Sequence, residues 1–293
     1  MEVYAMVSMS CHNVVYSVIK IVHDFIPMFF LSLKRTNEEN LNFIKSYKPQ
    51  NNDVENLRIL LHGPVGAGKS SFINSLESVL LGRVTGRVMT DTISANSFTK
   101  KYKAFKIHKD PKSFYPFIFN DTMGFEQRNG MNVEDIKLAL MGHVTEGYKP
   151  IPGVQLKESD QEYNSCPSLD DRVHALVCVM PADLVSLISD EVVKKMRDVR
   201  LAASDMGIPQ LAILTKVDEA CPEVKNNINN VYKSKYLKEQ VDKFSLILGI
   251  PQNCIFLVKN YESELQTNED INGPILIALR QMIVYGEDFI NNL

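Results

Sequence analysis

The stretch LRILLHGPVGAGKSSFINS, residues 57–75, decides the fold of this chain. It begins with a short apolar run, continues through three glycines, a lysine and a pair of serines, and ends with helical apolar spacing. Residues 63–70 fit the pattern GxxxxGK[ST] between a predicted strand and a predicted helix, which is the setting that a phosphate-binding loop (P-loop) requires. An incidental glycine turn is disfavoured because pattern and setting agree.

The residue types of this loop suit a chain of phosphates. Glycines let main-chain N–H groups converge on phosphate oxygens without an intervening Cβ, and the N-terminus of the next helix adds partial positive charge. Lys69 is expected to reach the β- and γ-phosphates, Ser70 to ligate Mg²⁺, and Ser71 to contact the α-phosphate. The predicted cradle consists of Gly63, Val65, Gly66, Ala67, Gly68, Lys69, Ser70 and Ser71.

Outside the loop, short apolar runs alternate with longer helical patterns, which predicts crossover units around a mainly parallel sheet. Strands are expected at 57–62, 101–108, 114–120, 173–179, 210–215 and 254–258. Helices are expected from the loop to Gly82, at 189–206, and from about Pro274 onward.

A second motif follows one of these strands. The run PFIFNDTMG ends with Asp121 and places Gly124 three residues later, the DxxG arrangement. Asp121 is expected to hold Mg²⁺ through a water molecule, and the Gly124 N–H to sense the γ-phosphate. Thr99 is the favoured switch ligand of Mg²⁺, ahead of Thr90 and Thr92, because it leads directly into the preceding strand.

A third motif, LAILTKVD, places Thr215, Lys216 and Asp218 at a strand end and matches [NT]KxD. A carboxylate there can accept hydrogen bonds from guanine N1–H and the exocyclic amine, whereas adenine has no matching donors. The Lys216 stem is expected to lie over the base, and backbone groups near Asn260 to cover it. TKVD alone fits a strand-end turn equally well, but three motifs in order on strand ends favour GTP or GDP with Mg²⁺ as cofactor.

These motifs predict an α/β, P-loop GTPase-like three-layer domain over residues 51–293. Residues 143–172 lack an apolar period and are expected to be a surface insertion that orders on demand. His62 and His174 lie on predicted strands, where we expect satisfied core or edge histidines.

Residues 1–50 are expected to form an N-terminal helical extension. Between residues 13 and 26, apolar side chains fall on one face of an amphipathic helix. Packing on the main domain or a partner is favoured over lying on a membrane, because the polar face is weakly basic. Charged residues and a proline interrupt the first 33 residues, so neither a signal peptide nor a spanning helix is expected.

Composition narrows the class further. The 293 residues are 45% hydrophobic, which is enough for one large domain or two small ones. A net charge of -3 argues against a nucleic-acid partner. The five cysteines are scattered and show no zinc spacing, which indicates reduced thiols in an intracellular protein.

Several segments carry a resemblance to a known family: GPVGAGKSSFINS, VTGR, DTMG, CPSLDDRVHALVCV, LAILTKVDEA, LGIPQNCIFLVKNY and ILIALRQMI. Together they resemble the interferon-induced protein 44 family, including its 44-like paralogue, over about Lys45 to Phe289. The resemblance implies a cytoplasmic, interferon-inducible, guanine-nucleotide-binding protein with antiviral or antiproliferative roles. Longer members carry an N-terminal TLDc-type domain that this sequence lacks, so the resemblance implies a short form.

GTP hydrolysis is expected to be slow or partner-dependent. The residue after the DxxG glycine, usually a glutamine that orients water, is Phe125. Gln127 could substitute only if the loop bends back, and Val65 adds a side chain where water and an incoming arginine must fit. An equal alternative is that another loop or a partner supplies the missing group, so catalytic residues stay unassigned.

We expect a switch or scaffold in innate immunity that works with protein partners, with homo-oligomerisation left open. Two other classes also stay open, an ATP-dependent P-loop phosphotransferase and a nucleotide-independent interaction scaffold. The sequence does not identify the partner or the roles of the insertion and the N-terminal helix.

Overall fold

The computed structural model describes residues 37–86, 101–125 and 131–293. The predicted helix at 13–26, the candidate switch residues Thr90, Thr92 and Thr99, and Gln127 lie outside these described residues. None of the helices in the three ranges combines the length and apolar character that crossing a bilayer requires.

In the described residues, six strands form one sheet in the order β2-β3-β1-β4-β5-β6. The strands are β1 (Leu57–His62), β2 (Lys103–Asp110), β3 (Ser113–Asp121), β4 (Ala175–Pro181), β5 (Gln210–Thr215) and β6 (Ile255–Leu257). Among these six described strands, β2 and β3 pair in antiparallel fashion, and the other neighbouring pairs are parallel. The predicted mainly parallel α/β sheet is therefore confirmed, and the segments that follow β1, β3, β5 and β6 all leave the same edge.

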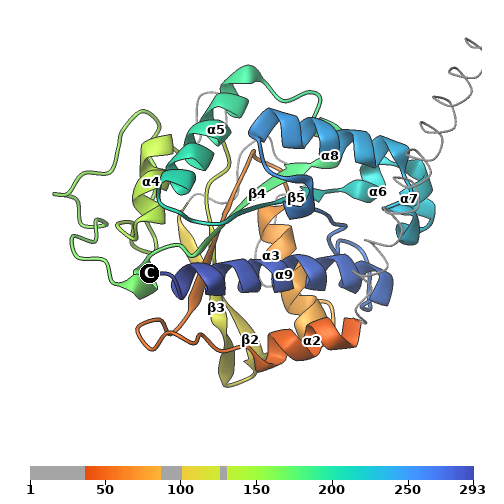
Figure 1. Ribbon diagram of the computed structural model, residues 1–293, viewed down its shortest axis with the longest axis horizontal. Coiled ribbons are helices and arrows are strands. Elements are labelled where there is room, and N and C mark those ends of the chain that lie inside the picture. Colours follow the sequence, from red (N-terminus) through yellow and green to blue (C-terminus); the bar gives the residue numbers. More distant parts are fainter. Residues whose placement is uncertain (1–36, 87–100, 126–130) are drawn as a thin grey trace, which may run out of the picture.

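Helices cover both faces of this sheet, which gives the predicted three layers (Figure 1). One face carries α2 (Asn37–Ser46), α3 (Lys69–Leu81) and α9 (Glu269–Ile290), and the other carries α4 (Val133–Leu140), α5 (Asp190–Asp205) and α8 (Lys235–Leu248). Short elements fill the connections: α6 (Val217–Ala220), α7 (Pro222–Asn226), η1 (Leu169–Asp171), η2 (Ala182–Leu184), η3 (Ile228–Asn230) and η4 (Gln252–Cys254).

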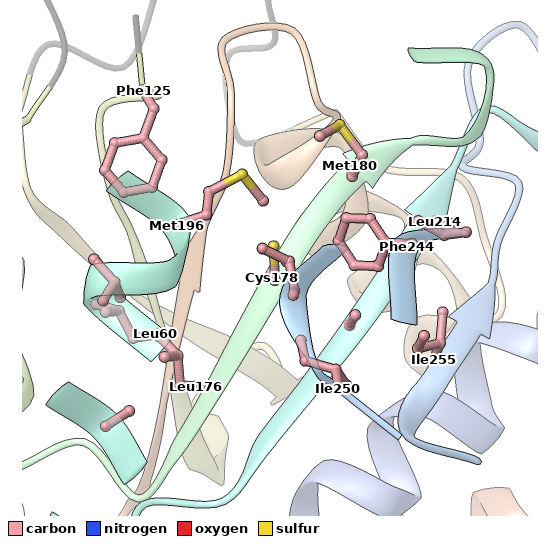
Figure 2. Close-up of a cluster of buried hydrophobic side chains, with 14 of the residues drawn as sticks. Leu60, Phe125, Leu176, Cys178, Met180, Met196, Leu214, Phe244, Ile250 and Ile255 are labelled. Atoms are coloured by element: carbon pink, nitrogen blue, oxygen red, sulfur yellow. The ribbon is translucent and has the colours of Figure 1, made fainter. Parts of the chain in front are cut away.

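The sheet separates two hydrophobic cores. Leu60 of β1 points to the core under α5 and α8, whereas its neighbours Ile59 and Leu61 point to the core under α3 and α9. Figure 2 shows the first of these cores, where strand side chains meet Met196 of α5 and Phe244 of α8. Both faces of the parallel strands are buried, which explains the nearly unbroken apolar runs of the strand sequences.

The C-terminal helix begins earlier than predicted. It begins at Glu269 and not near Pro274, which lies inside the helix. Asn268 caps the helix by accepting a hydrogen bond from the Asp270 N–H at 2.7 Å. The prediction was wrong because the preference of proline for a first helical turn was followed in place of the Asn cap and the acidic first turn.

Helix α2 packs along α9 and joins the start of the described chain to the main domain. Arg280 of α9 donates a hydrogen bond to the Asn40 side chain at 3.2 Å, and its guanidinium lies 4.4 Å from the centre of the Phe43 ring. Ile44 is fully buried in the α3 and α9 core. The residues 37–46 of the predicted extension therefore pack against the sheet domain.

The long segment 143–168 contains isolated bridges in place of helices or strands, yet it is tied to α4. The buried carboxylate of Asp135 accepts hydrogen bonds from the Tyr148 hydroxyl at 2.8 Å and the Leu156 N–H at 2.9 Å. Tyr148 and Leu156 are themselves buried, whereas Ile151 and Val154 at the tip are about half exposed. Single buried residues therefore hold this segment in place without an apolar period. The expectation that the insertion at 143–172 orders on demand stays a prediction.

Candidate functional site

The loop between β1 and α3 turns over the sheet edge through glycine conformations. The φ angles of Gly63, Gly66 and Gly68 are +145°, +72° and +87°, values that favour glycine. A Cβ on Gly63 would lie 2.0 Å from the carbonyl oxygen of Val179 in β4, whereas one on Gly66 would meet no atom within 4 Å. The loop therefore rests directly on the neighbouring strand, and its glycine turns at the α3 N-terminus are suited to an anion.

Lys69 opens α3, and its side chain folds back under the loop. Its Nζ donates hydrogen bonds to the carbonyl oxygens of Gly63 at 3.2 Å and Pro64 at 3.0 Å. The residue is only 6% exposed. Burial lowers the pKa of the Lys69 ammonium, and the nearby Asp121 charge acts in the opposite direction. A cation held at the base of a glycine loop is the arrangement that a phosphate chain requires.

One side-chain hydrogen bond joins the P-loop to the DxxG segment, and a second joins that segment to the β1 backbone. The Ser70 hydroxyl donates to Asp121 Oδ2 at 2.5 Å, and the Thr122 hydroxyl donates to the Leu61 carbonyl at 2.9 Å. Hydroxyl and carboxylate oxygens are the hard ligands that Mg²⁺ prefers, and Mg²⁺ commonly takes its other ligands from phosphate and water. The donor set of Ser70 and Asp121 therefore fits Mg²⁺.

The residues that follow Asp121 lie across the P-loop. Phe125 N–H donates to the Gly63 carbonyl at 3.0 Å, and Phe125 forms a parallel bridge with Pro64. A Cβ on Gly124 would come within 2.6 to 2.7 Å of Val65 backbone and side-chain atoms. Only glycine fits at position 124 in this arrangement, and the Val65 side chain occupies the space beside it.

Phe125 faces the protein interior. Its side chain belongs to the core under α5 and is 2% exposed, at one end of the cluster that includes Met196 (Figure 2). Its ring meets the His62 ring edge-on, with centroids 5.8 Å apart. Phe125 is apolar and buried, so it offers no group that could orient an attacking water.

The two strand histidines differ in their surroundings. His174 accepts a hydrogen bond from Arg58 N–H at 2.9 Å and donates one to the Leu169 carbonyl at 3.0 Å, and burial lowers its pKa to about 4. His62 Nδ1 is buried without a hydrogen-bond partner in the described residues. Burial, aided by the Lys69 charge, lowers the His62 pKa to about 3. The prediction of a satisfied histidine is correct for His174 and wrong for His62, because no donor or acceptor within residues 37–86, 101–125 and 131–293 bonds its Nδ1.

The third motif is connected to the first by a buried hydrogen bond. The Thr215 hydroxyl donates to the Ala67 carbonyl of the P-loop at 2.6 Å. Lys216 adopts a left-handed conformation with φ of 55°, and its Nζ lies 3.4 Å from Glu219 Oε2. Asp218 follows in the first turn of α6, with its side chain 22% exposed. The TKVD motif and the glycine loop thus lie side by side.

The segment after β6 completes this part of the site. Asn260 Nδ2 donates to the Gly68 carbonyl at 3.2 Å, and its Oδ1 has no partner among the residues described. Lys259 Nζ lies 3.5 Å from Asp218 Oδ2 and 2.8 Å from Glu264 Oε1. The sequence prediction did not include Lys259 and Glu264, and their only signal was their place in the run after the last strand.

Most of the predicted site residues lie at the carboxyl edge of the sheet, where α/β proteins bind ligands. They are the residues of the glycine loop, the DxxG motif and the TKVD motif, together with Asn260. Ser71 lies in the first turn of α3, and its carbonyl accepts a hydrogen bond from the Ser75 hydroxyl at 2.8 Å. Thr99 lies outside the described residues, so its predicted role stays a prediction.

No family model matches the chain. Interferon-induced protein 44 of Homo sapiens is 32% identical over 256 residues, which cover 86% of this chain and 57% of that protein. The Mus musculus protein of the same name is 31% identical and covers 86% and 60%. Interferon-induced protein 44-like of Homo sapiens is 33% identical and covers 85% and 56%. The chain spans 56 to 60% of the length of these curated relatives.

Solved structures also show similarity. Toc33 from Arabidopsis thaliana in complex with GDP and Mg²⁺ has a TM-score of 0.45 and 15% identity, with 88% of this chain and 93% of that chain covered. A probable GTP-binding protein engB has a TM-score of 0.36 and 12% identity, with 69% and 88% covered.

Proposed function

Over 86% of its length this chain belongs to the interferon-induced protein 44 family, and on that premise we propose that it binds guanine nucleotides with Mg²⁺. One observation carries the proposal: side-chain hydrogen bonds join the three motifs at a single sheet edge. Ser70 bonds Asp121, and Thr215 bonds Ala67. One ligand can therefore extend from the glycine loop to Asp218.

The phosphate end of the ligand is held by the loop and by Lys69. When phosphates bind, Lys69 Nζ exchanges the carbonyl oxygens of Gly63 and Pro64 for phosphate oxygens. Ser70 and Asp121 would hold Mg²⁺, which would supply neutralising charge next to the phosphates. Gly124 lies against Val65, which places its backbone at the mouth of the loop.

The base end of the ligand is read by Asp218. An ionised carboxylate only accepts hydrogen bonds, and the Watson–Crick edge of guanine offers it two donors. Adenine leaves the carboxylate without these donors, at a cost of roughly 1–3 kcal/mol for the lost pairing. Asp218 therefore favours the guanine assignment over the alternative of an ATP-dependent phosphotransferase.

Hydrolysis is proposed to be slow or dependent on a partner. Phe125 is buried where a water-orienting glutamine usually stands, and Val65 fills the space beside Gly124. Such a site suits a long-lived switch or scaffold better than a fast enzyme. By analogy with its relatives, we propose that the chain acts in the cytoplasm, with protein partners, in the interferon-linked innate immune and antiviral response.

Calorimetric titration of the purified chain with GDP and ADP, each with Mg²⁺, tests the proposal. We expect ADP to bind at least about tenfold more weakly than GDP. Asp218→Ala should weaken GDP binding and leave ADP binding unchanged, and Lys69→Ala should weaken both. Asp242→Ala is the matched control, because this exposed aspartate of α8 contacts Gln252 before β6, away from the site.

Each contrary result selects a different alternative. Equal binding of ADP and GDP, with no effect of Asp218→Ala, would favour the phosphotransferase. Absence of nucleotide binding, with partner binding retained in Lys69→Ala, would favour the nucleotide-independent scaffold. Rapid phosphate release in a single turnover by the isolated monomer would contradict slow hydrolysis.

A further inference from the structure

Three consecutive residues after β6 each contact a different part of the site. Lys259 lies beside the Asp218 carboxylate, and Asn260 donates to the Gly68 carbonyl. Tyr261 donates its N–H to a serine hydroxyl of α3 at 2.8 Å. This one short segment therefore joins the base motif, the glycine loop and the helix that follows the loop.

The position of the segment is fixed from the side of α9. The Tyr261 hydroxyl donates to Asn272 Oδ1 at 2.8 Å and accepts a hydrogen bond from the Asn268 N–H at 2.6 Å. Tyr261 is buried, so these bonds are shielded from water. The backbone that carries Lys259 is thus set before any ligand arrives.

The Lys259 ammonium lies between two carboxylates. Its Nζ is 2.8 Å from Glu264 Oε1 and 3.5 Å from Asp218 Oδ2, and all three side chains are 22–23% exposed. Glu264 Oε2 accepts hydrogen bonds from the N–H groups of Glu262 and Ser263 at 2.9 and 3.2 Å. The loop backbone therefore orients Glu264, and Glu264 in turn orients Lys259.

We propose that Lys259 is a specificity-determining residue that holds the Asp218 carboxylate with both oxygens available to a bound guanine. A carboxylate has about four lone-pair sites, so Oδ2 can accept from Lys259 and from the base at the same time. Without the ammonium, rotation of the carboxylate weakens whichever of the two base bonds is less well aligned. This inference rests on the proposed guanine-nucleotide function.

Hypoxanthine is the probe that isolates this effect. It has the N1–H of guanine and lacks the exocyclic amine, so IDP makes one bond to Asp218 where GDP makes two. The ratio of GDP affinity to IDP affinity therefore measures how well both carboxylate oxygens are used. A Lys259 that served only to order the loop would change both affinities by the same factor.

The experiment is calorimetric titration with GDP and IDP, each with Mg²⁺. We expect Lys259→Met to lower the GDP/IDP affinity ratio by roughly tenfold, the size of one charge-assisted hydrogen bond. Lys259→Arg, which keeps the charge, should restore most of the ratio, and Glu264→Gln should give an intermediate value. Lys195→Met is the matched control, because it removes a lysine from the Glu191 ion pair on α5.

If Lys259→Met folds and loses GDP and IDP affinity by the same factor, the GDP/IDP ratio is unchanged and the inference is overturned. The proposed function still stands in that case, provided that the wild type prefers GDP to ADP. If wild type shows no such preference, both fall together. If Lys259→Met does not fold, Glu264→Gln decides, and an unchanged ratio there overturns the inference.

Discussion

Two regions at the same sheet edge are built differently. We call residues 62–71 and 121–125 the phosphate corner, and residues 215–218 and 259–264 the base corner. Backbone shapes the phosphate corner: glycines at positive φ turn the loop, and the loop rests on β4. Side chains shape the base corner, where a hydroxyl, an ammonium and carboxylates from two strand ends meet. A corner made of backbone should fail when a Cβ is added, and a corner made of side chains should fail when a single functional group is removed.

The largest expected effect comes from Gly63→Ala in the phosphate corner. Its Cβ would lie 2.0 Å from the Val179 carbonyl oxygen, at a φ of +145°, so the loop or β4 must move. We expect the free energy of unfolding to fall by at least about 3 kcal/mol. Gly66→Ala is the matched control, with a φ of +72° and no atom within 4 Å, and should cost about 1 kcal/mol. Equal losses in urea denaturation would contradict a loop shaped by β4.

Acid should separate the two corners, because different groups titrate in each. His62, in the phosphate corner, has its pKa lowered from 6.5 to about 3 by burial and by the Lys69 charge. The unfolded chain takes up this proton near pH 6.5 and the folded chain does not, so stability is lost as pH falls from 6.5 toward 3. The slope approaches about 1.4 kcal/mol per pH unit. His62→Leu should flatten it, although His174, whose pKa is also lowered, keeps part of it.

In the base corner, the pKa of Glu264 is lowered from 4.5: burial raises it, but hydrogen bonds from Lys259 and the loop backbone outweigh burial. Its stabilising effect is present above pH 4.5 and is lost as pH falls below that value. Glu264→Gln should therefore alter the stability profile only at the acid end. Urea unfolding between pH 7 and about pH 3 covers the range in which both groups titrate. An unaltered slope between pH 6.5 and 5 in His62→Leu would rule out the role given to His62.

Thr215→Val tests the bond that joins the two corners. Valine keeps the shape of threonine and removes the hydroxyl that donates to the Ala67 carbonyl at 2.6 Å. We expect a loss of about 1–2 kcal/mol in unfolding free energy together with weaker GDP binding. Thr145→Val is the control, because its hydroxyl makes an exposed bond to the Glu162 carbonyl at 3.0 Å and should change stability by less than about 0.5 kcal/mol. Equal losses in both variants would mean that the corners are not coupled through Thr215.

The same contrast explains what could be predicted from the sequence. The glycine loop was predictable because its backbone conformations demand particular residue types at fixed spacing. Helix α3 ends at Leu81 and is capped by Gly82, the residue predicted to end it. Strand β5 matches the predicted range 210–215 because both of its faces are buried from Leu211 onward and its central run LAIL is apolar. Local backbone requirements can be predicted because they restrict the types of neighbouring residues in the sequence.

Contacts between segments far apart in the sequence produce no such local pattern. Lys259 meets Asp218 only because β6 lies beside β5, and that neighbourhood is a property of strand order. The inward direction of Phe125 depends on its packing against His62 and the α5 core. The anchoring of Tyr148 depends on one buried carboxylate from α4. Each of these partners has ordinary residue types at no special spacing.

Substitution of Lys216 is expected to change the free energy of unfolding least. It should also separate an effect on stability from an effect on GDP binding most clearly. With φ of 55°, it is the only residue other than glycine at positive φ in the described parts of the chain. Lys216→Gly relieves a left-handed strain of about 1–2 kcal/mol and adds about 1 kcal/mol of unfolded-chain freedom, so stability should stay level or rise slightly. The exposed pair with Glu219 contributes little to this balance.

GDP affinity should nevertheless fall in Lys216→Gly, because the side-chain stem expected over the base is lost. Lys216→Met keeps an apolar stem and should retain most of the GDP affinity. The phosphate corner places glycine wherever φ is positive and so avoids strain, whereas the base corner keeps a strained lysine. Calorimetry with GDP beside urea unfolding measures the two quantities on the same variants. Unchanged GDP affinity in Lys216→Gly would remove Lys216 from the site and leave its left-handed conformation as a feature of the β5–α6 turn alone.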